Sequence, residues 1–173
     1  MGLSIGEQVS VEDLLRGVIV LSGNDACIVL AEGLSGTEEA FAEEMTALAQ
    51  SMGLTSAQFK NSSGLDAPGH RISAADLAPM AQLEIAKFPE YYNYYAEAEM
   101  TWGGITQQNR NPLLGRMEGA DGLKTGHLSI SGYGLTASAI RDGERRIIVI
   151  NGLPSSSDRA QEAERLMRLA FSA

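Results

Sequence analysis

The sequence is poor in the residues that bind metals and form cross-links. Its 173 residues include one cysteine, Cys27, and two histidines, His70 and His127, which lie far apart. A single cysteine excludes a disulfide within the chain and a metal site built from several cysteines. Because the sequence has no HExxH pattern and no cluster of histidine and cysteine, it also argues against a metal enzyme. We therefore expect no metal and no cofactor.

Basic residues are in short supply as well. Lysine and arginine together number 13, against 22 for aspartate and glutamate, which leaves a net charge of −9. Such acidity argues against a nucleic-acid-binding protein, because phosphate binding needs clustered lysine and arginine. It does not exclude an anionic substrate, since a ligand responds to the local field of its site rather than to the net charge.

Long apolar runs are also lacking. A membrane-spanning helix needs about 18 consecutive apolar residues, and the best stretch, GVIVLSGNDACIVLAEG, is interrupted by Ser22, Gly23, Asn24 and Asp25. The opening residues, MGLSIGEQVS, lack the basic and apolar regions of a signal peptide. With 44% hydrophobic residues the chain can still build a core. We expect either a cytoplasmic chain or a fragment of something longer, with no membrane segment.

The first half of the sequence has helical periodicity. Apolar residues recur at helical spacing after Ser10, which forms a capping-box pattern with Asp13. The polar triplet SGN at 22–24 interrupts the pattern before a second apolar helix, so we expect a loop there. A third, amphipathic helix is predicted from Thr37, its N-cap, to Gly53, which stops it.

The second half changes character after Pro89. The tyrosines of 91–95 and Trp102 are β-favouring aromatics, and GLKTG, YGLTASAI and RRIIVINGL resemble three strands. Asp142 and Gly143 are a strong hairpin signal between the last two of these strands, and a final helix follows. The predicted fold class is α+β, with a helical lobe at about 1–90 and an antiparallel sheet plus a C-terminal helix at about 91–173.

Two short polar motifs could carry chemistry. SGN lies between two helices and KTG, at 124–126, lies on a predicted strand. Each triplet alone is a weak signal, because three residues recur by chance in many proteins. A site formed where the helical half meets the sheet half would hold two hydroxyls, an amide and an ammonium group. These groups together are suited to binding an anionic substrate.

The chain resembles the serine D-alanyl-D-alanine carboxypeptidases, the low-molecular-mass penicillin-binding proteins of the β-lactamase/DD-peptidase superfamily. That superfamily carries S-x-x-K, then an S-D-N-type triplet, then K-T-G. The resemblance covers essentially the whole chain. It rests on segments that occur in the family's order: VSVEDLLRGVIVLSGNDACIVLAEG, NSSGLDAPGH, QQNRNPLL, DGLKTGHLSISGYGLTASA and SDRAQEAERL.

This resemblance implies roles for the polar residues of the first motif and for Lys124. Ser22 would relay protons to or from the leaving amine. Asn24 would hydrogen-bond the substrate's amide and the catalytic lysine. Lys124 would add positive potential for the peptide's C-terminal carboxylate and would tune Ser22.

It also implies a binding surface for the substrate around the second motif. Thr125 would hydrogen-bond the terminal carboxylate, and Gly126 would keep the strand open, because a side chain there would collide with the substrate. The backbone N–H of His127 would supply half of an oxyanion hole. Arg110 of NRN and Arg159 of SDR match family positions that help to bind the carboxylate.

Each of these residues also has a purely structural interpretation. Ser22 and Asn24 could form an ordinary helix-breaking loop and cap. Lys124 could be an edge-strand lysine that prevents aggregation. Arg110 and Arg159 could form surface ion pairs, and the sequence alone leaves these alternatives open.

The family's nucleophile motif does not occur in this sequence. The residues three positions before Lys60, Lys87 and Lys124 are alanine, glutamate and aspartate, so there is no S-x-x-K. Ser22 therefore has no lysine partner of the kind that activates a serine in this chemistry. We expect the chain to be N-terminally truncated, to lack the family's first strands and nucleophile helix, and to be inactive alone.

Further expectations concern the parent protein and its partners. The parent would act on peptidoglycan stem peptides that end in D-Ala-D-Ala, would be trapped by β-lactams such as penicillin, and would lie in the periplasm or cell envelope. An uncovered sheet edge in the chain would favour dimerisation, domain swapping or pairing with the missing segment. The alternative is a non-catalytic peptidoglycan- or partner-binding relative. A β-lactamase is less favoured, because there is no convincing acidic deacylation loop.

Overall fold

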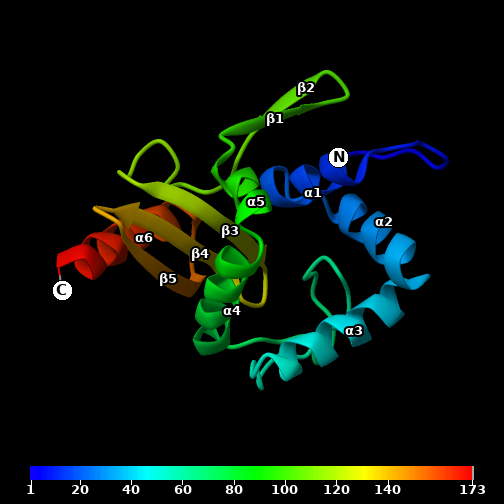
Figure 1. Cartoon of the computed structure of the whole chain (residues 1–173), viewed down its shortest axis with the longest axis horizontal. Helices are drawn as coiled ribbons and strands as arrows, with labels where there is room; N and C mark the ends of the chain where they lie inside the picture. Colours follow the sequence, from blue (N-terminus) through cyan, green and yellow to red (C-terminus); the bar gives the residue numbers. More distant parts are fainter. Residues whose placement is uncertain (173) are drawn as a thin grey trace. The chain divides into compact units, whose positions relative to one another are not determined.

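The computed structural model describes residues 1–172 and confirms the α+β class. The helices are α1 (Val11–Val20), α2 (Asn24–Ser35), α3 (Glu38–Ser51), α4 (Ala74–Lys87), α5 (Pro89–Tyr92), the 3₁₀ helix η1 (Asn93–Ala96) and α6 (Ser156–Ser172). The strands are β1 (Glu99–Trp102), β2 (Ile105–Gln108), β3 (Ala120–Leu128), β4 (Gly132–Arg141) and β5 (Glu144–Leu153) (Figure 1). None of the helices in this range is both long and apolar enough to cross a membrane.

The described chain divides into two units. The first holds Met1–Ser73 together with Glu99–Gln108, and the second holds Ala74–Ala98 together with the chain from Asn109 onward. The first unit thus contains α1, α2, α3 and the β1–β2 hairpin, and the second contains α4, α5, η1, the other strands and α6. The boundary expected near residue 90, between a helical lobe and a sheet, stays a prediction.

Helices α1 and α3 of the first unit begin at the predicted caps. The Ser10 Oγ accepts from the Asp13 N–H at 3.0 Å, and the Thr37 Oγ1 accepts from the Ala40 N–H at 3.1 Å. Each bond satisfies an N–H that the first turn of a helix leaves without a backbone acceptor. Gly53, at φ 84, follows the end of α3, as expected of a helix-terminating glycine.

The segment after α3 is tied back to that helix. The Phe59 N–H donates to Thr46 Oγ1 at 2.9 Å, and the N–H and hydroxyl of Ser62 both donate to Glu38 Oε1, at 3.0 and 2.6 Å. Gln58 and Arg71 exchange two backbone hydrogen bonds of 2.8 Å across the base of the segment. The glycine- and proline-rich stretch between them is therefore an anchored loop.

The second unit has three layers, with an antiparallel sheet between helices. Strands β3, β4 and β5 form an antiparallel sheet in that order, and helices α4 and α6 cover its opposite faces (Figure 1). The α6 face is the larger core. Small alanines of β4, fully buried, let the helix approach closely. That core consists of Leu113, Met117, Leu135, Ala137, Ala139, Ile148, Ile150, Ala163 and Met167.

The predicted hairpin between β4 and β5 is confirmed. Asp142 and Gly143 link the strands with φ values of 50° and 80°, the left-handed conformation that a two-residue hairpin turn of this type requires. The final helix is also confirmed and begins at Ser156.

Two local expectations were wrong or incomplete. The tyrosines at 91–95 lie in α5 and η1 rather than in strands, because Pro89 pre-organises a helical first turn and the rings of Tyr92 and Tyr95, three positions apart, pack at 5.6 Å. The β1–β2 hairpin escaped prediction. Its signal is Gly103-Gly104, both at positive φ, between two short strands.

Candidate active site

The SGN triplet forms the sharp connection between α1 and α2. Ser22 is half-buried and has a φ of 55°, a conformation that few residues other than glycine adopt. Gly23 is buried, and a Cβ there would lie 3.2 Å from Asp25 Oδ1 and 3.3 Å from the Gly17 carbonyl oxygen. Asn24 is exposed and is the first residue of α2. The predicted loop is therefore confirmed for Ser22 and Gly23, whereas Asn24 already belongs to α2, and close packing explains the glycine at 23.

Asp25 anchors this connection to the start of the chain. Its carboxylate accepts hydrogen bonds from the Met1 ammonium at 2.9 Å, from the Gly2 and Leu3 N–H groups at 2.6 and 3.0 Å, and from the Ala26 N–H at 3.0 Å. Partial burial acts to raise the pKa of Asp25, but these four donors outweigh it and lower the pKa to about 2. The carboxylate is thus ionised at neutral pH and holds the turn in place.

The KTG triplet lies on β3, which is an edge strand of the three-stranded sheet. Lys124 pairs with Thr136 and Thr125 with Leu135 of β4, and both Lys124 and Thr125 are half-buried. The Lys124 ammonium donates to the Thr125 carbonyl oxygen at 3.1 Å. Gly126 is exposed, and no atom of residues 1–172 lies within 4 Å of the position that a Cβ would take. Packing among the described residues therefore gives no reason for a glycine at 126.

Three side chains form a stack near the C-terminal end of β3. His127 pairs with Tyr133 across β3 and β4, and the two rings stack with their centres 3.9 Å apart at 29°. The guanidinium carbon of Arg159, in the first turn of α6, lies 5.6 Å from the centre of the Tyr133 ring. Thus three elements of the second unit meet at one stack.

Arg159 is a buried cation. It is 8% exposed, its Nε atom is buried and has no hydrogen-bond partner, and within residues 1–172 its guanidinium forms no ion pair. Burial lowers the pKa of Arg159, interaction with Tyr133 opposes this, and the positive charge of Arg110 lowers the pKa further. The two arginines are therefore within electrostatic reach of each other. The surface ion-pair interpretation of Arg159 is wrong, because the side chain is buried and no carboxylate pairs with it in this range.

Two asparagines hold the backbone on either side of Arg110. Asn109 donates to the Glu97 carbonyl oxygen at 3.0 Å and accepts from the Asn111 N–H at 3.0 Å. Asn111 is 4% exposed and donates to the Gly122 carbonyl oxygen of β3 at 2.9 Å. These bonds fix the backbone on both sides of Arg110. The Arg110 side chain itself is exposed to solvent.

A polar network secures the start of β3. The Arg145 guanidinium donates to Asp121 Oδ1 at 2.8 Å and also to Ser138 Oγ, and the Tyr92 hydroxyl donates to Asp121 Oδ1 at 2.9 Å. Burial raises the pKa of Tyr92 above its usual range, so the hydroxyl remains protonated and able to donate. The network joins α5, β3, β4 and β5 three residues before Lys124.

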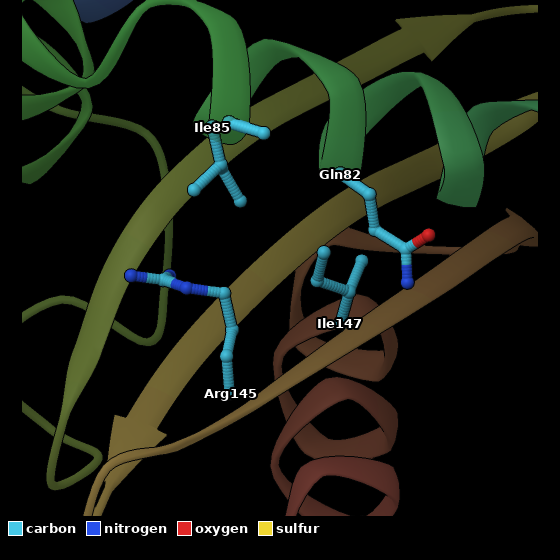
Figure 2. A pocket seen from close by; sticks show the side chains of 5 residues that line it. Gln82, Ile85, Arg145 and Ile147 are labelled. Carbon is cyan, nitrogen blue, oxygen red and sulfur yellow. The ribbon is translucent and has the colours of Figure 1, made fainter.

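A cavity of about 250 Å³ lies beside this network, between α4 and β5. Figure 2 shows Gln82 and Ile85 of α4 opposite Arg145 and Ile147 of β5. Its lining contains none of the predicted site residues, and Arg145 already donates to Asp121. The cavity is therefore separate from the candidate site.

The predicted site residues are divided between the two units. Ser22 and Asn24 belong to the first unit, whereas Arg110, the 124–127 stretch and Arg159 belong to the second. The second unit brings His127 and Arg159 to the same aromatic ring, and Arg110 close enough to influence Arg159.

Comparison with known proteins identifies the family. The family model for D-alanyl-D-alanine carboxypeptidase matches residues 1–154. The chain belongs to the D-alanyl-D-alanine carboxypeptidase family. It is 48% identical over 170 residues to the D-alanyl-D-alanine carboxypeptidase DacD of Escherichia coli, a match that covers 97% of this chain and 44% of that protein.

Solved structures of the family share the fold. Penicillin binding protein 5 from Haemophilus influenzae superposes with a TM-score of 0.94 at 42% identity, covering 98% of this chain and 50% of that chain. A penicillin-binding protein from Listeria monocytogenes, solved with cefotaxime bound, gives a TM-score of 0.87 at 31% identity, covering 96% of this chain and 69% of that one. The chain spans about half the length of the carboxypeptidase relatives that it matches.

Some residues of this carboxypeptidase-family chain escaped attention in the sequence. Tyr133 lies between Gly132 and Gly134 in a stretch that otherwise resembles an ordinary strand. Asp121 precedes KTG by three residues, and its partner Arg145 follows the hairpin turn. No sequence spacing reveals these contacts, because they depend on strand register. For Tyr133, the one available signal was its position between two glycines.

Proposed function

We propose that this chain carries the substrate-binding part of a serine-type D-alanyl-D-alanine carboxypeptidase. The whole protein would remove the terminal D-alanine from a peptidoglycan pentapeptide through an acyl-enzyme. The observation that carries the proposal is Arg159, a buried cation without an ion-pair partner in residues 1–172. Its aromatic neighbour Tyr133 stacks on His127, next to the open strand position Gly126.

A peptide's C-terminal carboxylate fits this arrangement. A buried charge is costly unless it is paired, and 22 acidic residues in the chain supply no partner for Arg159 within the described range. A carboxylate from outside would provide both the negative charge and the acceptor oxygens. Arg110 would add a second cation, and the Thr125 hydroxyl and Lys124 ammonium would contribute a hydrogen bond and positive potential.

The remaining residues would serve the reacting bond. The His127 N–H would be one of two oxyanion donors, and the vacant position above Gly126 would admit the peptide backbone. Ser22 would relay the proton to the leaving amine, and Asn24 would bind the substrate amide. The unusual φ of Ser22 supports such a role, since strained backbone is often retained at functional sites.

Catalysis itself would need the serine and the lysine that the S-x-x-K motif supplies in this family. The sequence contains no S-x-x-K, the motif that supplies the family's nucleophilic serine and the lysine that activates it. The chain alone is therefore expected to bind D-alanyl peptides without forming an acyl-enzyme. Capture of β-lactams such as penicillin would belong to the whole protein, as would its place in the periplasm or cell envelope.

Two measurements on the chain test this proposal. N-acetyl-D-alanyl-D-alanine should shift the backbone amide signals of Thr125 and His127 in NMR titrations, whereas its C-terminal amide should not. Intact mass spectrometry after incubation with a fluorescent penicillin should show no covalent adduct. A stoichiometric adduct on Ser22, or equal binding of acid and amide, would refute it.

A non-catalytic peptidoglycan-binding relative is the second candidate, favoured by the absence of S-x-x-K. Both candidates predict binding of D-alanyl peptides. The coding sequence around this segment distinguishes the two candidates, because an S-x-x-K in the same reading frame would support the enzyme. If the whole protein carries that motif but takes up no penicillin, the binding module is the better account.

A further inference from the structure

We propose that Tyr133 is a positioning residue that holds the Arg159 guanidinium ready for the substrate's carboxylate. The inference rests on the proposed function and adds a residue to which neither sequence motifs nor family resemblance assigned a role. It concerns how a buried arginine is kept in place before any anion arrives.

The physical problem is that no hydrogen-bond acceptor within residues 1–172 orients the buried Nε of Arg159. A guanidinium carries five N–H donors in a fixed plane and is usually aligned by a carboxylate. Such an internal partner would neutralise Arg159 and occupy the donors that a substrate needs. The Arg159 guanidinium instead lies over the Tyr133 ring, 5.6 Å from its centre. An aromatic face attracts the cation through its quadrupole and leaves the in-plane donors available.

Tyr133 is itself held firmly. Its ring stacks on His127 at 3.9 Å, and the two residues are register partners across β3 and β4. The glycines on both sides bring the backbone close to β5. A Cβ on Gly132 would lie 2.7 Å from the Leu153 carbonyl oxygen, and one on Gly134 would overlap the Asn151 side chain. The backbone that carries the ring is therefore packed closely against β5, and the ring itself stacks on His127.

Helix α6 fixes the other side of the contact. Arg159 lies in its first turn, where the Ser155 hydroxyl accepts from the Asp158 N–H at 3.1 Å and the Arg159 N–H donates to the Ser155 carbonyl oxygen at 3.0 Å. The stack thus links the helix start to the strand that carries KTG. One ring would align the carboxylate-binding cation with the strand end that carries the proposed oxyanion donor.

The test follows the Nε–Hε signal of Arg159 by ¹⁵N NMR, assigned by its loss in R159K. N-acetyl-D-alanine should shift this signal in the unaltered chain, and N-acetyl-D-alaninamide should not. We expect Y133F to bind the acid within about twofold of the unaltered chain, and Y133L to bind about fivefold more weakly, as loss of a cation–π contact implies. The backbone spectra of α6 and β4 show whether each variant is folded.

A second replacement keeps the test decisive if Y133L does not fold. Pentafluorophenylalanine at position 133 keeps the shape of phenylalanine but reverses the ring quadrupole, so it should weaken binding as leucine does. Equal affinities for the phenylalanine and pentafluorophenylalanine variants would overturn the positioning role while the proposed function stands. If the unaltered chain shows no response to the acid, it is the proposed function that fails.

Discussion

The Arg145 guanidinium and the Asp121 carboxylate form an ion pair at 2.8 Å that joins β5 to the start of β3. Both side chains are about three-quarters buried, with 26% and 23% of their surface exposed. The Tyr92 hydroxyl and the fully buried Ser138 share the same network. Residues distant in the sequence thereby fix the strand that carries Lys124 and Thr125.

Removal of Asp121 should therefore destabilise the second unit. We expect D121A to lower the free energy of unfolding by about 2 kcal/mol, because Arg145 and Tyr92 would lose a charged acceptor in a partly buried place. Urea denaturation measures the change. The matched control is E144A, which removes the exposed partner of Arg146 at 2.7 Å and should cost less than about 0.5 kcal/mol. Equal effects of the two variants would contradict the assignment.

The backbone at Ser22 should be strained, and a glycine at this position should relieve that strain. Because Ser22 has a φ of 55°, S22G should raise the free energy of unfolding by about 1 kcal/mol. S22A removes the same hydroxyl but keeps the constraint, so it should bring no such gain. Urea denaturation of both variants separates the effects. If S22A stabilises the chain as much as S22G does, the conformation is not strained.

The open position at Gly126 should matter for binding and not for folding. No atom of residues 1–172 lies within 4 Å of a Cβ there, so G126A should change the free energy of unfolding by less than about 0.5 kcal/mol. It should nevertheless weaken binding of N-acetyl-D-alanyl-D-alanine, measured by NMR titration. G119A is the contrast, because Gly119 has a φ of 75° and its Cβ would overlap the Ile140 carbonyl oxygen. That variant should lose about 2 kcal/mol or more.

His70 should make the first unit sensitive to mild acid. Its Nδ1 accepts from the Lys60 N–H at 3.1 Å, and partial burial lowers the pKa of the imidazole below its ordinary value of 6.5. Since the folded pKa is the lower one, this contribution to stability is present above about pH 6.5 and is lost as the pH falls through the folded pKa. H70Q should flatten that part of the pH dependence. An NMR titration that gives a pKa of 6.5 or higher would contradict the prediction.

The sheet edge at β5 should promote association. Strand β5 pairs with β4 along one side, and within residues 1–172 no strand pairs with its other side. An unpaired edge presents N–H and carbonyl groups to another chain. We expect dimerisation or domain swapping at micromolar concentrations, detected by light scattering during size-exclusion chromatography. A monodisperse monomer would count against it.

Local patterns in the sequence predicted much of the fold. The interruption of apolar spacing at 22–24 and the turn residues Asp142 and Gly143 act within a few positions, so their effects can be inferred without tertiary information. The helical state of Tyr92 could not, because strand propensity says nothing of the packing against Tyr95 and the bond to Asp121. The family motifs singled out the candidate residues, whereas the burial of Arg159 and the contribution of Tyr133 depend on strand register and helix docking.

The central claim is that Arg159 recognises a terminal carboxylate. It is tested most directly by the ratio of affinities for N-acetyl-D-alanyl-D-alanine and its C-terminal amide, measured by NMR titration in the unaltered chain and in R159Q. R146Q, which alters an arginine paired with Glu144 elsewhere in the second unit, is the control. We predict a clear preference for the acid in the unaltered chain and in R146Q that disappears in R159Q. An unchanged preference in R159Q would contradict the account.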